Sequence, residues 1–250
     1  MSILLLVLAA FFLPLFPASV VFNRLAAAND HLGVRLALFV LWPQIGVLLI
    51  LWSDLAVAPG LIAAWALLSA LLYAFRMLTV REVGRWSAML ASSAWPLAWL
   101  YALQTPGVAN LVAFTLALTV APVLMLLVCA ALTTRLEAAY TGLHGGLARD
   151  LPRLSGVIVV TTLAAMALPL FPGFFALLAV LGGATLWMAI GILLTWLLWS
   201  WAGVRLLEGT VFGPRSGPIA ADLTVLAAWG LSLLIGVIVA GGLAWTGGAL

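Results

Sequence analysis

The sequence has no lysine and, among its 250 residues, a single cysteine and two histidines. Cys129 alone cannot form a disulfide framework or a cysteine-rich metal site. Neither His31 nor His144 has a second metal-ligating residue at a usual spacing. No Ser/His/Asp set or glycine-rich phosphate loop can be assembled either. We therefore expect no metal, no cofactor and no catalytic residues, so the chain is predicted not to be an enzyme.

Charge is scarce as well: 7% of the residues are charged, whereas 66% are hydrophobic and the mean hydropathy is +1.30. A soluble domain of this length cannot bury so much apolar surface, so a bilayer must cover the excess. The formal charge of +3 comes from ten arginines spread over short loops. We interpret it as a signal of membrane orientation and expect no nucleic-acid partner.

Long apolar runs recur with short polar interruptions. Backbone polar groups must be paired in hydrocarbon, and runs of about 20 apolar residues suit helices rather than barrel strands. The sequence predicts one all-α, polytopic transmembrane domain over residues 1–250. Its eight predicted helices cover residues 3–22, 36–52, 57–75, 86–103, 108–132, 154–171, 174–201 and 223–245. No positive charge precedes the first run, which argues against a cleaved signal peptide.

Every arginine falls on one side of this arrangement. The arginines lie in the segments after the first, third, fifth and seventh predicted helices: Arg24, Arg35, Arg76, Arg81, Arg85, Arg135, Arg149, Arg153, Arg205 and Arg215. The odds that ten charges fall on one side by chance are about one in five hundred. Basic loops are retained in the cytoplasm. We therefore expect these loops in the cytoplasm and both termini outside.

A few residues are candidates for a site. Asp54 is the one acid predicted on the outer side, so it is a candidate ion port, although a solvated helix end is the more common situation. Pro122 is the best candidate for a helix break beside an ion route, since proline frees a backbone carbonyl. A kink that only shapes the helix is the alternative for Pro122.

A second group of candidates shares the cytoplasmic loops. A membrane enzyme or quinone site could use these residues, while a loop stabilised by local ion pairs is the simpler interpretation. They are Glu82, Glu137, His144, Arg149, Asp150 and Arg153.

Two motifs bracket the sixth predicted helix. Gly145-Gly146-Leu147 is followed by Pro152, and Leu168-Pro169 is followed by Gly173-Phe174. Together they resemble the GGL-x-x-x-MP loop and LP-x-x-x-GF turn of the antiporter-like membrane subunits of respiratory complex I and Mrp-type cation/proton antiporters. The segment from Thr79 to Ser93 is similar to an upstream element of that family. The resemblance covers about residues 72–181 and implies a complex I-like membrane subunit.

The sequence departs from this family where protons would move. Counted back from the GGL motif, the family's membrane lysine is replaced by Pro122 and its histidine by Leu118. The glutamate that follows the GF turn is missing from residues 174–178. Without titratable groups a proton relay has no steps.

The preferred hypothesis is therefore a shortened accessory subunit of a bacterial inner-membrane assembly. That assembly would be complex I-like or an energy-coupled ion or inorganic-carbon uptake system. Its expected partners are larger antiporter-like or redox membrane subunits and the lipid bilayer. The alternative is an autonomous transporter or channel for a small solute or ion.

Overall fold

The described part of the chain is built from helices, with no strand. The computed structural model describes residues 2–53, 55, 58–143, 145–213 and 221–247. Its helices are α1 (Ser2–Phe12), α2 (Ser19–Ala28), α3 (Leu32–Leu51), α4 (Pro59–Met77), α5 (Val83–Ala94), α6 (Leu97–Ala102), α7 (Val108–Leu136), α8 (Leu147–Asp150), α9 (Pro152–Ala165), α10 (Pro172–Gly182), α11 (Leu186–Thr210) and α12 (Val225–Gly247).

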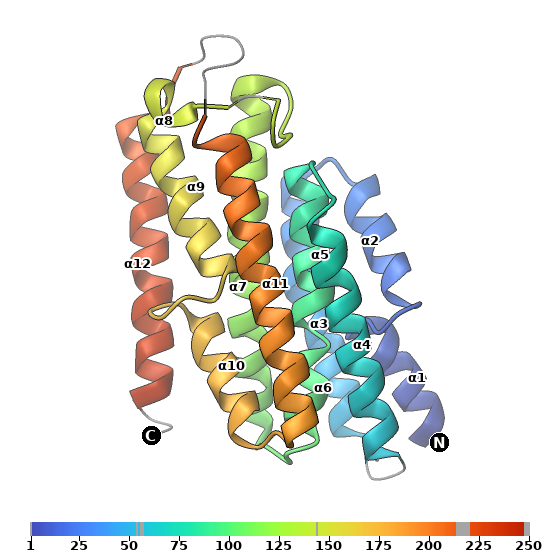
Figure 1. The fold of residues 1–250 in the computed structure, drawn as a ribbon. Helices are drawn as coiled ribbons and strands as arrows, with labels where there is room; N and C mark the ends of the chain where they lie inside the picture. The colour runs from blue at the N-terminus through green and yellow to red at the C-terminus, as the bar shows by residue number, and fades with distance from the viewer. Residues whose placement is uncertain (1, 54, 56–57, 144, 214–220, 248–250) are drawn as a thin grey trace.

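These helices form an elongated bundle (Figure 1). Five of them, α3, α4, α7, α11 and α12, are long and apolar enough to cross a membrane individually. The pairs α1–α2, α5–α6 and α9–α10 are half-helices stacked end to end. Residues rise about 1.5 Å each in a helix, so the 11 residues of α1 span too little of a hydrocarbon core about 30 Å thick. With each pair counted as one pass, the described chain is a polytopic bundle of eight passes.

Two of the predicted helix boundaries are wrong. The sequence placed a helix end near Phe171 and a continuous helix over residues 174–201. The structure instead makes α9 and α10 one discontinuous pass and puts the turn between passes at Gly183, Ala184 and Thr185. The predicted first and fourth helices are also interrupted, near Pro14 and Pro17 and at Pro96. Continuous hydrophobicity cannot separate a break in mid-membrane from a loop between passes, because both ends of a break stay in hydrocarbon.

All described arginines lie at one end of the bundle, which we call the arginine end. They are in loops there, or within two turns of helix ends that meet there. Figure 1 shows α8 at this end, while the start of α1 and the end of α12 lie at the other. Arg215 is outside the described residues. The sequence predicts that the arginines and the termini lie at opposite ends, and this arrangement agrees with that prediction.

Tryptophan side chains satisfy carbonyl groups exposed by the first break. The indole N–H of Trp99 donates to Leu13 O at 3.0 Å, and that of Trp65 donates to Phe16 O at 2.6 Å. Trp42 donates to Phe11 O at 3.3 Å. A carbonyl without a partner is costly in an apolar surrounding. These bonds therefore tie the interrupted first pass to three other helices.

Side chains from other passes also donate to backbone carbonyls of the α9–α10 pass. At the end of α9 the indole N–H of Trp196, from α11, donates to Met166 O at 2.8 Å. At the end of α10 the amide of Gln104 donates to Val180 O at 2.8 Å. Gly183 makes room for that amide, since a Cβ there would lie 2.4 Å from Gln104 Cδ. Neutral donors from neighbouring passes therefore bind the C-terminal ends of α9 and α10.

We predict that Trp99→Phe destabilises the chain. The variant keeps an aromatic ring in a buried position but leaves Leu13 O without its donor, which costs about 1–3 kcal/mol. The measurement is the unfolding free energy in detergent or bicelles. The matched control is Trp86→Phe, because Trp86 is also buried and its indole has no hydrogen-bond partner in the described residues. Equal losses in both variants would contradict the assigned role of the Trp99 bond.

Candidate functional site

The two motifs that carry the family resemblance lie at the two ends of α9. Gly146, in the left-handed region at φ 71°, precedes α8, and its N–H donates to Phe212 O at 3.1 Å, just after α11. At the other end the chain turns between α9 and α10 through Ala167 and Leu170, whose φ values are 48° and 92°. Such values cost roughly 1–2 kcal/mol per non-glycine residue. The surrounding structure therefore imposes this break.

Helix α7 runs without interruption through Pro122, so the expected helix break is not there. The breaks lie in α1–α2, α5–α6 and α9–α10 instead. Pro122 still makes a polar contact, because the hydroxyl of Ser87 in α5 donates to Pro122 O at 2.6 Å. This bond joins two buried helix faces at the position that the sequence resemblance aligns with a lysine.

Neutral groups make up the rest of the polar interior. Thr115, Thr119 and Thr162 donate to carbonyls one turn earlier in their own helices at 2.7–2.9 Å. The indole of Trp95 donates to Thr119 Oγ1, and that of Trp199 to Ser93 Oγ. None of these groups changes its charge near neutral pH. These groups can therefore hold helices in register, but none of them takes up and releases a proton near neutral pH.

The predicted loop cluster is partly dispersed in the structure. Glu137 is exposed at the left-handed end of α7, and Arg149 is exposed on α8. Glu82 pairs with Arg85 at 2.8 Å, one turn away on the same segment. Asp150 also has an interaction partner. His144 and Asp54 are outside the described residues, so their predicted roles stay predictions.

Arg153 has a partner that the sequence did not indicate, 69 residues away. The carboxylate of Asp222 accepts hydrogen bonds from the backbone N–H groups of Arg153, at 2.9 Å, and Leu154, at 3.1 Å. The Arg153 guanidinium in turn donates to Leu223 O at 2.9 Å. Asp222 thus caps the N-terminus of α9, whose first N–H groups have no partner within the helix. These contacts tie the segment before α12 to α9.

The environment of Asp222 changes its acidity. Burial raises the pKa of this carboxyl, but hydrogen bonds from the backbone N–H groups of Arg153, Leu223 and Leu154, helped by the Arg153 charge, lower it more. The net result is a pKa below the usual value for aspartate. Asp222 is therefore charged in the folded protein at neutral pH, as a helix cap requires.

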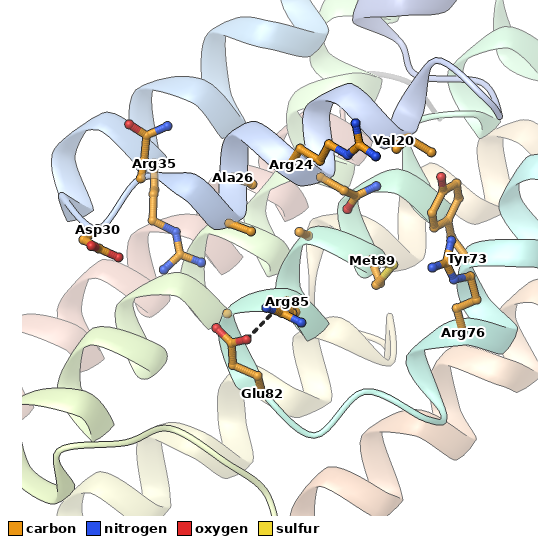
Figure 2. Close-up of a pocket in the computed structure, with 15 residues that line it drawn as sticks. Val20, Arg24, Ala26, Asp30, Arg35, Tyr73, Arg76, Glu82, Arg85 and Met89 are labelled. Carbon is orange, nitrogen blue, oxygen red and sulfur yellow. Dashed lines mark ion pairs between the residues drawn. The ribbon is translucent and has the colours of Figure 1, made fainter.

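The structure also gathers charges that the sequence indicated only as an orientation signal. A cavity of about 350 Å³ opens between α2, α3, α4 and α5 at the arginine end, and we call it the arginine pocket. Each of these four helices contributes one arginine to its lining: Arg24, Arg35, Arg76 and Arg85 (Figure 2). In the sequence, Arg24 and Arg35 lie in one predicted cytoplasmic segment and Arg76 and Arg85 in another, which is a common topology signal. Only the folded arrangement shows that these side chains share a cavity.

Comparison with known proteins places this geometry among respiratory membrane complexes. The chain superposes on a chain of respiratory complex I from Thermus thermophilus with bound NADH, with a TM-score of 0.81 and 25% identity over 93% of its length. It is also similar to a chain of the membrane-bound sulfane sulfur reductase, an archaeal respiratory membrane complex (TM-score 0.78, 19% identity, 95% covered). A chain of respiratory complex I from Thermus thermophilus with bound aureothin gives a TM-score of 0.74, with 18% identity over 94% of this chain. No family model and no curated protein sequence matches.

The chain spans about half the length of these structures: 52%, 51% and 54% of the respective chains are covered. The likeness extends over nearly the whole of this chain, beyond the residues 72–181 that carry the motifs. It supports a multi-pass membrane protein with the fold found in subunits of complex I-like assemblies.

We predict that the Asp222 cap gives a pH-dependent contribution to stability. A carboxyl with a lowered folded-state pKa stabilises the fold above the unfolded pKa of about 3.9, and this contribution is lost as the pH falls through the folded value. Asp222→Ala should lower stability at pH 7 by about 0.5–2 kcal/mol, the usual loss for a helix cap. The difference from the unmodified chain should shrink as the pH falls below about 4.

Thermal unfolding of both chains between pH 7 and pH 3 measures this effect. Glu208→Ala is the matched control, since Glu208 is exposed near the end of α11 at the same end of the bundle. If the difference between Asp222→Ala and the unmodified chain were the same at every pH, the carboxylate would not be the stabilising species.

Proposed function

We propose that the chain is a non-catalytic membrane subunit of a multi-subunit, complex I-like assembly in a bacterial inner membrane. Its role there is structural or accessory: it packs beside larger antiporter-like or redox subunits and shapes their surroundings. The observation that carries this proposal is the likeness over 93% of the chain to a complex I chain, in a bundle whose described interior is neutral.

The positions where the related family places relay residues support an accessory role. Leu118 is buried in α7, and Pro122 accepts a hydrogen bond from Ser87. Residues 174–178 of α10 are Phe, Phe, Ala, Leu and Leu. A proton relay needs groups that gain and lose charge in sequence, and those at mid-membrane are normally acids, lysines or histidines.

The helix breaks are present although the titratable relay residues of the antiporter-like family are replaced in this chain. In transporters, discontinuous helices place backbone dipoles and carbonyls beside an ion. Here the carbonyls at the α1–α2 and α9–α10 breaks accept from tryptophan side chains instead. The fold shared with the complex I chain therefore has these carbonyls used for internal packing. Such a chain suits a partner that recognises the shape.

The last helix offers room for a neighbouring subunit. Helix α12 contacts α9 and α10 on one side, while Leu226, Trp229, Leu233 and Val237 are exposed along the others. In a bilayer these side chains face lipid tails or the helices of a partner.

The test is purification of the assembly from its native membrane. A tag on the C-terminus, mild detergent extraction and native mass spectrometry should recover the chain with a larger antiporter-like or redox membrane subunit in fixed stoichiometry. Two controls are needed: an untagged strain, and an unrelated polytopic membrane protein carrying the same tag.

Recovery of the folded chain alone, together with transport of a solute or ion by that chain in liposomes, would contradict the proposal. That result would favour the autonomous transporter, and Asp54 and Pro122 would be the first residues to substitute. Co-purification with an inorganic-carbon uptake complex would instead identify the kind of assembly.

A further inference from the structure

The arginine pocket has features of a binding site that the proposed function does not use. Its arginines come from four successive helices, so their convergence depends on the tertiary fold and not on one helix face. Figure 2 shows Arg24, Arg35, Arg76 and Arg85 distributed around the cavity, with Glu82 joined to Arg85 below. The lining also includes one further acid, Asp30.

Positive charge exceeds negative charge in this pocket. Four guanidinium groups face two carboxylates, which leaves a formal excess of two positive charges. Arg85 is paired with Glu82, whereas no carboxylate of the described residues lies within 4.0 Å of the guanidinium nitrogens of Arg24, Arg35 or Arg76. Arg76 lies 5.7 Å from the centre of the Tyr73 ring, which is a cation–π contact. The pocket therefore has spare capacity for an anion.

Arg35 is held in the pocket by the packing around it. Its guanidinium crosses over Gly84 in α5, where a Cβ would lie 2.6 Å from the nearer terminal nitrogen. The Nε atom of Arg35 is buried and has no hydrogen-bond partner among the described residues. A buried donor without an acceptor costs about 1–3 kcal/mol. The guanidinium of Arg35 therefore keeps a donor that no described residue uses.

The amide and hydroxyl groups deep in the pocket already have hydrogen-bond partners within the protein. Asn23 donates through Nδ2 to Ser92 Oγ at 2.9 Å and to Ser19 O at 2.8 Å, and Ser19 is bonded to Tyr73 at 2.6 Å. Val20, Ala26 and Met89 add apolar surface to the same lining. The cavity thus has a charged part formed by arginines and an apolar part formed by side chains of α2 and α5.

We propose that the arginine pocket binds a phosphate group. Guanidinium forks match the oxygen geometry of phosphate, and several of them around one cavity favour an anion with more than one acceptor oxygen. A volume of about 350 Å³ accommodates a small headgroup. Basic pockets between helices on the cytoplasmic side are suited to anionic lipid headgroups, and a free phosphate ion offers the same oxygens. The inference is independent of which assembly contains the chain.

The experiment uses the purified full chain, with its native lipid removed, in a zwitterionic detergent. Native mass spectrometry with equal amounts of phosphatidylglycerol and phosphatidylcholine measures the preference for the anionic lipid. A parallel arm measures thermal stabilisation by inorganic phosphate, with chloride at equal ionic strength as its reference. The pocket variants are Arg24→Gln and Arg76→Gln, both exposed residues whose replacement leaves the core intact, and Arg35→Gln.

The matched control variants are Arg81→Gln and Arg205→Gln. These exposed arginines lie at the same end of the bundle but outside the arginine pocket, so they report the general attraction of basic surface to anionic lipid. Each pocket substitution should reduce the preference for phosphatidylglycerol about tenfold, the fold-change expected for losing one hydrogen bond between charged groups. Each control should change it by much less.

Pocket-dependent selection of phosphatidylglycerol would identify a lipid headgroup as the ligand. Stabilisation by inorganic phosphate that is lost in the same variants, without lipid selection, would identify a soluble phosphate as the source. Equal binding of both lipids with no phosphate effect would overturn the proposal, as would equal losses in pocket and control variants. Unfolding curves of every variant exclude misfolding as the cause of a loss.

Discussion

The structure depends on the pairing of backbone carbonyl and N–H groups in an apolar surrounding. A continuous helix meets this requirement by itself, but three of the passes are interrupted and expose carbonyls within the bundle. At the α1–α2 and α9–α10 breaks, side chains from other passes donate to these carbonyls, as Trp99 does for Leu13 and Trp196 does for Met166. Each such bond links helices distant in the sequence. The breaks are therefore also the points where the bundle is held together.

Charge is distributed by the same constraint. An ion in hydrocarbon costs several kcal/mol, whereas a neutral hydrogen-bonded pair does not. Acids and arginines of the described chain accordingly meet at the arginine end. There they perform two different tasks: Asp222 caps α9 and holds the segment before α12, while four arginines surround an open cavity. The neutral interior and the charged end together suit a chain that shapes a complex without carrying protons.

Much of this fold could be predicted from the sequence, and the failures have physical causes. Hydrophobic runs and arginine placement predict the all-helical membrane bundle and the end where charges gather. They do not separate the α9–α10 break from a loop, because residues on both sides remain apolar. Pro122, the candidate for a break, lies inside an uninterrupted α7, so a proline in an apolar run does not by itself locate a break. The Arg153–Asp222 contact and the arginine pocket join residues far apart in the chain, for which no local pattern exists.

The most direct test of the central claim, that the neutral interior does not translocate protons, is a flux measurement on the purified chain. Liposomes containing the folded chain and a pH-sensitive dye would be given a membrane potential and compared with empty liposomes. The account predicts the same proton flux in both. Flux well above that of empty liposomes, proportional to the amount of chain, would contradict it and would require a titratable path through the bundle.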